Sequence, residues 1–258
     1  MDELKPKSVM VTANAPNRVQ EAKEWAVQHN YLYTEETAPA ADYLIIFAED
    51  RIGIQAIKKP HTNAFYLDYT TGRLGFRAHH ASKQNELLAK AVGLKGKKTL
   101  SVIDATAGLG RDAWILATLG AHVILLERSP ILALLLHDAI ARSKPLETKV
   151  QLIHCDATHW LTTHIKQKLI KADVIYLDPM FPERSKTAAI KKEMVILRDL
   201  VGSDLDAVAL FESALACPVS RIVVKRPIHA HEISPDVSPT YSIKGRANRF
   251  DVYIRSVT

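Results

Sequence analysis

A glycine-containing segment, Asp104–Gly110, lies where an apolar run gives way to a helical pattern. Gly108 and Gly110 would allow the backbone to approach a ligand closely, and a helix that begins near Arg111 would offer it unpaired amide N–H groups. The spacing Gly108-x-Gly110-x-x-Ala113 also satisfies the dinucleotide-binding fingerprint in its Gly/Ala form. The segment predicts a nucleotide site; the alternative is a tight strand-to-helix turn that binds no ligand.

Three carboxylates indicate which nucleotide this site would hold. Glu127 follows the next apolar run, where an acid can accept hydrogen bonds from the ribose hydroxyls, unless it is an ordinary solvent-facing residue. Asp104 precedes the glycines, so it would repel a pyrophosphate but attract the ammonium group at the methionine end of S-adenosylmethionine (SAM). Asp156-Ala157 follows the third run, in position for an adenine contact, although Asp156 could instead cap the following turn. Together these residues favour SAM over NAD.

The tetrapeptide Asp178-Pro179-Met180-Phe181 follows a further apolar run and resembles the Asp/Asn-Pro-Pro-aromatic signature of methyltransferases that modify exocyclic amines of bases. The lone pair of such an amine is delocalised into the ring, so the nitrogen is a poor nucleophile. Hydrogen bonds from its N–H groups to the Asp178 carboxylate and to the Pro179 carbonyl would favour the pyramidal, nucleophilic form. Phe181 can stack on the base. An ordinary proline-rich turn is the alternative.

Strand and helix patterns alternate along the larger part of the chain, which would position these segments. Strands are expected at 99–104, 123–127, 151–154, 174–177, 221–225 and 250–255, and helices at 85–92, 111–119 and 131–142. Continuous apolar runs suit strands that are covered on both faces. The chain is therefore expected to be α/β, with a doubly wound, mostly parallel sheet of the class I SAM-dependent methyltransferase type.

The N-terminal part has a different pattern, so residues 1–78 are expected to form a small α+β subdomain and residues 79–258 the methyltransferase domain. Within the subdomain we expect strands at 9–12 and 43–47, a helix at 17–28, and a hairpin whose strands, 65–69 and 74–76, flank a Thr70–Arg73 turn.

The chain has 258 residues, and its 34 Lys and Arg residues exceed its 28 Asp and Glu residues, which gives a formal charge of +6. This charge favours an anionic partner. Basic residues that follow the ends of expected strands are candidates for phosphate contacts with a nucleic acid: Arg184, Lys186, Lys191, Lys192, Lys225 and Arg226.

Two cysteines cannot build a disulfide framework or a cysteine-rich zinc site. The pairs His79-His80 and His229-x-His231 lack further ligands at suitable spacing, so no metal is expected. The N-terminus lacks the apolar core of a signal peptide, and apolar runs are too short to span a bilayer. We therefore expect a cytoplasmic protein without membrane attachment.

Six segments together resemble the small-subunit (16S) ribosomal RNA guanine-N2 methyltransferase J family: 104–112, 126–128, 176–182, 191–194, 223–227 and 249–253. The resemblance implies a SAM-dependent enzyme that methylates the exocyclic N2 amine of one guanine in small-subunit ribosomal RNA, either free or in the assembled subunit. It implies cofactor contacts at Arg111, Asp112, Glu127, Arg128, Asp156-Ala157 and Asp178.

Two other classes of function stay open. A methyltransferase of the same fold could act on another amine, such as adenine N6 or a protein glutamine, because the tetrapeptide does not choose among amines. A non-catalytic RNA-binding assembly factor is the second class. An NAD-dependent dehydrogenase is disfavoured, since no histidine is placed by motif to serve hydride transfer.

Overall fold

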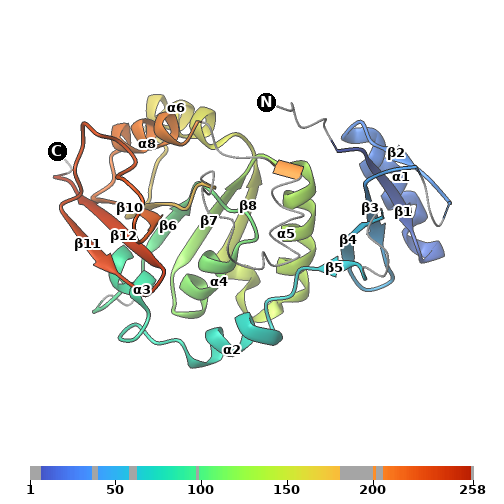
Figure 1. Cartoon of the computed structure of the whole chain (residues 1–258), viewed down its shortest axis with the longest axis horizontal. Helices are drawn as coiled ribbons and strands as arrows, with labels where there is room; N and C mark the ends of the chain where they lie inside the picture. The colour runs from blue at the N-terminus through green and yellow to red at the C-terminus, as the bar shows by residue number, and fades with distance from the viewer. Residues whose placement is uncertain are drawn as a thin grey trace. The chain divides into compact units, whose positions relative to one another are not determined.

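The computed structural model describes residues 7–36, 40–57, 63–96, 99–180, 200–201 and 206–256 (Figure 1). The chain divides into two compact units. The smaller consists mainly of the N-terminal residues up to Asp68, and the larger contains Tyr69–Leu136, Ile140–Pro182 and Ser203–Thr258. All the residues that the sequence singles out for cofactor binding belong to the larger unit.

The smaller unit is an α+β unit built on a five-stranded sheet in the order β2-β1-β3-β4-β5. Its elements are β1 (Val9–Ala13), α1 (Val19–Gln28), β2 (Leu32–Tyr33), β3 (Tyr43–Phe47), β4 (Ile52–Ala56) and β5 (Phe65–Tyr66). The expected strands at 9–12 and 43–47 and the expected helix are confirmed. Strand β4 was not expected, because Gly53 interrupts its apolar pattern. A Cβ at Gly53 would lie 2.6 Å from the Tyr66 ring, so glycine allows β5 to pair closely with β4.

The expected hairpin around Thr70–Arg73 is wrong. Its first strand shortens to β5, which pairs with β4, and the second is replaced by the helix α2 (Gly72–His80). Leu74, Gly75 and Ala78 recur at helical spacing and are half-buried, and a Cβ at Gly75 would overlap the carbonyl oxygen of Thr70. Helical packing of these small and apolar residues therefore outweighs the local turn signal.

The larger unit contains a seven-stranded sheet in the order β11-β12-β10-β9-β6-β7-β8. Its strands are β6 (Ser101–Asp104), β7 (His122–Glu127), β8 (Val150–His154), β9 (Val174–Leu177), β10 (Arg221–Pro227), β11 (Tyr241–Lys244) and β12 (Asn248–Ile254). Five strands are parallel, whereas β12 runs antiparallel to β10 and β11 antiparallel to β12. The doubly wound, mostly parallel sheet is thereby confirmed, and strand β11, which is largely exposed, is an addition at its edge.

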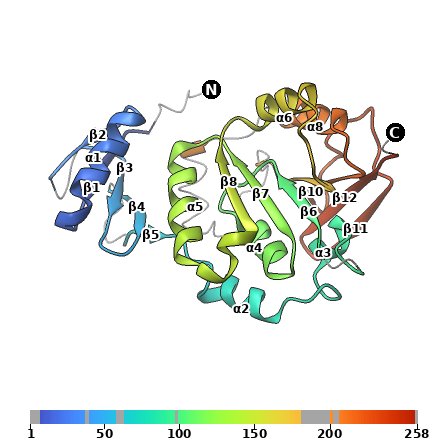
Figure 2. The same ribbon diagram turned by 180° about the vertical axis from the view of Figure 1, so that it is seen from behind.

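Helices cover both faces of this sheet (Figures 1 and 2). They are α3 (Leu87–Val92), α4 (Arg111–Thr118), α5 (Pro130–Arg142), α6 (Ala157–Lys166) and α8 (Ala207–Ala216). On one face, α6 and α8 pack together over strand residues such as Ile175, Leu177 and Val224, while α3 and α4 pack against strands on the other. In the described part of the chain, no helix has the length and apolar character needed to cross a membrane.

Candidate active site

The glycine loop connects β6 to α4 as the sequence predicts. Gly108 and Gly110 adopt left-handed backbone angles, with φ of 54° and 62°, and Gly110 is the N-cap of α4. A Cβ at Gly110 would lie 2.5 Å from the Tyr69 hydroxyl, so this position requires glycine. At Gly108 a Cβ would come no closer than 3.9 Å to its nearest neighbour, the Thr106 carbonyl oxygen. The loop is therefore held firmly at Gly110 and leaves room for a ligand at Gly108.

Glu127 ends β7 and is connected directly to this loop. One carboxylate oxygen accepts a hydrogen bond from the Gly108 amide at 2.9 Å, and the other accepts one from the Ser129 amide at 2.8 Å. The side chain is buried, so these backbone donors hold it in one orientation. Since each carboxylate oxygen can accept more than one hydrogen bond, Glu127 fits the ribose-binding role that the sequence predicts.

A cluster of three carboxylates lies at the carboxyl edge of the sheet. Asp104 ends β6, Asp112 stands in the first turn of α4, and Asp178 follows β9. The Lys225 Nζ donates to Oδ2 of Asp112 and to Oδ2 of Asp178, both at 2.7 Å, and the Tyr176 hydroxyl donates to Oδ2 of Asp112 at 2.7 Å. Lys225 therefore joins the acid in the first turn of α4 to the acid of the tetrapeptide.

A second connection joins the two loops through Thr106. The Asp178 amide donates to the Thr106 Oγ1 at 2.6 Å, and the Thr106 amide donates to the Asp104 Oδ1 at 3.1 Å. The backbone at Asp178 is thus fixed by the same loop that carries Gly108. Thr106 and Tyr176 lie within the segments 104–112 and 176–182, but the sequence assigned neither a role, and their contacts follow only from the tertiary structure.

Burial and charge shift the pKa values of Asp104 and Asp112 in opposite directions. Burial raises the pKa of Asp104 to about 8; the Thr106 amide opposes this shift, while Asp112 and Asp178 add to it. Burial likewise opposes ionisation of Asp112, but Lys225, Arg77 and the Tyr176 hydroxyl outweigh it and hold the pKa of Asp112 well below its ordinary value. At neutral pH Asp104 is therefore mostly neutral and Asp112 ionised.

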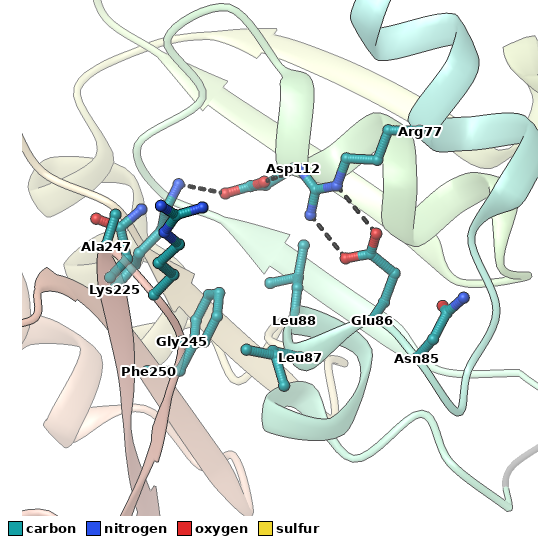
Figure 3. A pocket seen from close by; sticks show the side chains of 12 residues that line it. Arg77, Asn85, Glu86, Leu87, Leu88, Asp112, Lys225, Gly245, Ala247 and Phe250 are labelled. Atoms are coloured by element: carbon teal, nitrogen blue, oxygen red, sulfur yellow. Dashed lines mark hydrogen bonds and ion pairs between the residues drawn. The ribbon is translucent and has the colours of Figure 1, made fainter.

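A cavity of about 310 Å³ adjoins this network (Figure 3). Arg77 from α2 binds both oxygens of Glu86, at 3.0 and 2.8 Å, and reaches Asp112 at 3.3 Å. The cavity is lined by Arg77, Asn85, Glu86, Leu87, Leu88, Asp112, Lys225, Gly245, Arg246, Ala247, Asn248 and Phe250. Its volume is at the lower end of the range for small-molecule sites. Sequence reasoning missed Arg77 and Glu86, because they lie on different elements and share no motif.

Other predicted cofactor residues lie near the same edge with additional partners. Arg128 donates to Asp206 at 2.7 Å. Asp156 caps α6 by accepting a hydrogen bond from the His159 amide at 2.8 Å, which is the capping role that the sequence left open. Ala157 is the first residue of α6, and Arg111 is the first residue of α4.

Two residues predicted to contact RNA, Lys225 and Arg226, instead make contacts within the protein. Lys225 takes part in the acid network, and Arg226 is buried and donates from Nε and Nη2 to the His231 carbonyl oxygen. The remaining predicted contacts, Phe181, Arg184, Lys186, Lys191 and Lys192, lie outside the described residues. Within the described ranges, no group of three or more His, Cys, Asp or Glu side chains is placed to hold a metal ion.

Comparisons with known proteins identify the family. Residues 25–255 match the family model described as "Putative SAM-dependent methyltransferase". The "Ribosomal RNA small subunit methyltransferase J" of Thioalkalivibrio sulfidiphilus is 47% identical over 73% of this chain and 75% of that protein. The protein of the same name from Vibrio parahaemolyticus is 36% identical over 93% and 95%. Among solved structures, a SAM-dependent methyltransferase from Neisseria gonorrhoeae aligns with a TM-score of 0.72 and 26% identity, covering 96% of each chain.

These relatives confirm the predicted cofactor and fold. The glycine loop lies at the carboxyl edge of a class I sheet, which is where open α/β sheets bind their ligands, so the assignment of its carboxylates to the SAM site stays a prediction. The chain is a SAM-dependent methyltransferase, and it belongs to the ribosomal RNA small subunit methyltransferase J family.

Proposed function

We propose that this enzyme transfers a methyl group from SAM to the exocyclic N2 amine of a guanine in small-subunit ribosomal RNA. The observation that carries the proposal is the placement of Asp178, which Lys225 and Thr106 hold beside the cofactor loop. The choice of small-subunit ribosomal RNA as the substrate rests on the names of the relatives from T. sulfidiphilus and V. parahaemolyticus.

Several residues would hold the cofactor, which when bound supplies an electrophilic methyl group on its sulfonium sulfur. Glu127 would accept hydrogen bonds from the ribose, next to the open backbone at Gly108. Asp104 and Asp112 would face the ammonium group, and Asp104, which is mostly neutral without a ligand, would ionise when that cation binds. The proposed set also includes Arg111, Arg128, Asp156 and Ala157. Of these, Asp156 and Ala157 would contact the adenine.

The Asp178 carboxylate would accept a hydrogen bond from the amine of the target base. Its side chain is 39% exposed, so a substrate can reach it, and Lys225 stabilises its charged form. The Pro179 carbonyl is the proposed second acceptor, and Phe181 the proposed stacking partner. The methylated nitrogen must lose a proton, and an ionised carboxylate within hydrogen-bond distance can receive it.

RNA binding is proposed for Arg184, Lys186, Lys191 and Lys192. The positions of Lys225 and Arg226 instead support roles inside the protein. Lys225 orients Asp178, and Arg226 ties the end of β10 to the segment at His231. We further propose that the enzyme works in the cytoplasm, where it would meet free ribosomal RNA or the assembled subunit.

Transfer of radiolabelled methyl groups to ribosomal RNA from cells that lack the enzyme tests this proposal. Nucleoside analysis of the product should show N2-methylguanosine, whereas N6-methyladenosine or labelled protein would indicate one of the other amine substrates. Asp178→Ala should abolish transfer while RNA still binds, and SAM binding measured in parallel separates a loss of cofactor from a loss of the methyl-transfer step. Wild-type protein that binds RNA and transfers no methyl group would support the assembly-factor alternative.

A further inference from the structure

Helix α2 presents one continuous exposed face. Arg73, Phe76, His79 and His80 are exposed, whereas the residues between them, Leu74, Gly75, Arg77 and Ala78, are half-buried. The exposed positions recur every three to four residues and so share one side of the helix. Phe76 is 67% exposed, which is unusual for a large aromatic side chain.

The aromatic part of this face is held in a fixed arrangement. The rings of Phe76 and His80 are stacked, with centroids 4.1 Å apart and an interplanar angle of 29°. His80 is also tied to the backbone, since its Nδ1 lies 2.8 Å from the Phe76 carbonyl oxygen. A preformed stack loses little side-chain entropy when a third ring is added to it.

The exposed face carries one permanent charge, that of Arg73, because Arg77 lies on the half-buried side of the helix. Residues 72–80 contain no acidic residue. Arg77 of the same helix extends inward to Asp112 and Glu86 (Figure 3). The helix that carries the exposed face is thereby connected through Asp112 and Lys225 to Asp178.

We propose that the exposed face of α2 binds an unpaired stretch of the RNA substrate close to the target guanine. The Phe76–His80 stack would receive an unpaired base, and Arg73 would contact a phosphate. An exposed aromatic stack that shares its helix face with an arginine matches single-stranded RNA, whose bases stack and whose backbone is anionic. The inference rests on the proposed function, because it takes ribosomal RNA as the substrate.

Binding assays with unmodified small-subunit ribosomal RNA, without methyl transfer, test the inference. Phe76→Ala should weaken RNA binding by about tenfold, in line with the loss of one stacked base. Phe76→Trp keeps a stacking surface and should retain the wild-type affinity. Arg73→Ala should make the salt dependence of binding shallower by about 0.7 in log–log slope. SAM affinity should not change in any variant.

Leu169→Ala is the matched control, because Leu169 is also an exposed apolar residue, 53% exposed, on the loop after α6. This variant should bind RNA as the wild type does. Helix α2 has no fully buried residue, so the α2 variants should fold, which thermal unfolding will verify.

Wild-type affinity and salt slope in both Phe76→Ala and Arg73→Ala would overturn the inference. So would an effect seen only on assembled subunits, because it would assign the face to a ribosomal protein. Failure of the proposed function would look different: the wild-type enzyme itself would leave guanine unmethylated, whatever the α2 variants do.

Discussion

At the scale of single residues, the buried acid Asp104 is the most informative. It is 2% exposed and lies near two further carboxylates, and its pKa is about 8 where an ordinary aspartate has 3.8. A protein selected for stability alone would have little use for such a group. A cationic ligand changes its environment, because a positive charge nearby favours the ionised carboxylate. Its burial supports the proposal that Asp104 faces the cationic group of the cofactor.

This reasoning predicts a pH-dependent stability cost. The folded state favours the neutral form of Asp104. The contribution of Asp104 to the free energy of unfolding is therefore fully present below pH 3.8 and is lost as the pH rises through about 8. Asp104→Asn removes this loss. In the absence of cofactor, its gain in unfolding free energy over the wild type should be larger at pH 8 than at pH 5 by more than about 1 kcal/mol. Urea unfolding at the two pH values measures it, with the exposed Asp236→Asn as control; equal gains would contradict the assignment.

Cofactor binding should show the opposite trend with pH. If a cation ionises Asp104, binding of S-adenosylhomocysteine releases a proton, and affinity should rise from pH 6 to about 8 and then level off. Calorimetry in buffers of different ionisation enthalpy detects that proton directly. In Asp104→Asn the affinity should be lower and the proton release absent. Proton release of the wild-type size in this variant would rule Asp104 out.

At the scale of elements, strands β6 and β10, helix α4 and the segment after β9 each contribute one ionisable side chain at the carboxyl edge of the sheet. Lys225 on β10 contacts Asp112 on α4 and Asp178 after β9 because these elements are neighbours at the carboxyl edge of the sheet. The expectation that Lys225 contacts RNA came from its place in a basic pair, Lys225-Arg226, after a strand. The sheet instead directs this side chain toward the acids.

Lys225→Met should therefore impair catalysis rather than RNA binding. Without the ammonium group Asp178 loses its orientation, so kcat should fall by on the order of a hundredfold, and the acidic limb of the rate profile should move to higher pH. RNA affinity and its salt slope should stay as in the wild type. Lys225→Arg should retain part of the activity. A reduced salt slope with an unchanged kcat would restore the RNA-contact role.

At the scale of the whole molecule, the net charge of +6 agrees with a polyanionic substrate. RNA contacts are proposed separately for the basic residues after Asp178 and for the exposed face of α2. The division of the chain near residue 78 into a subdomain and a catalytic domain stays a prediction.

Neutralising Lys191 and Lys192 together should weaken RNA binding and make its dependence on salt shallower. Each phosphate contact that is lost reduces the number of counterions that RNA binding releases. Cofactor affinity should not change. Filter binding at several salt concentrations measures the slope, and calorimetry measures the cofactor. An unaltered slope would exclude these lysines from the RNA surface.

The sequence by itself determined the methyltransferase fold and indicated the glycines and acids that follow its strands. Continuous apolar runs predicted β6, β7, β9 and β10, and the glycines and acids at their ends predicted a SAM site, because these signals are local and periodic. Helix α2 and its Arg77 were decided only in the tertiary structure. There, small residues pack against the preceding backbone and override a hairpin signal. The contacts of Lys225, Thr106 and Tyr176 were likewise decided by strand order, because only that order places groups far apart in the chain within 3 Å of each other.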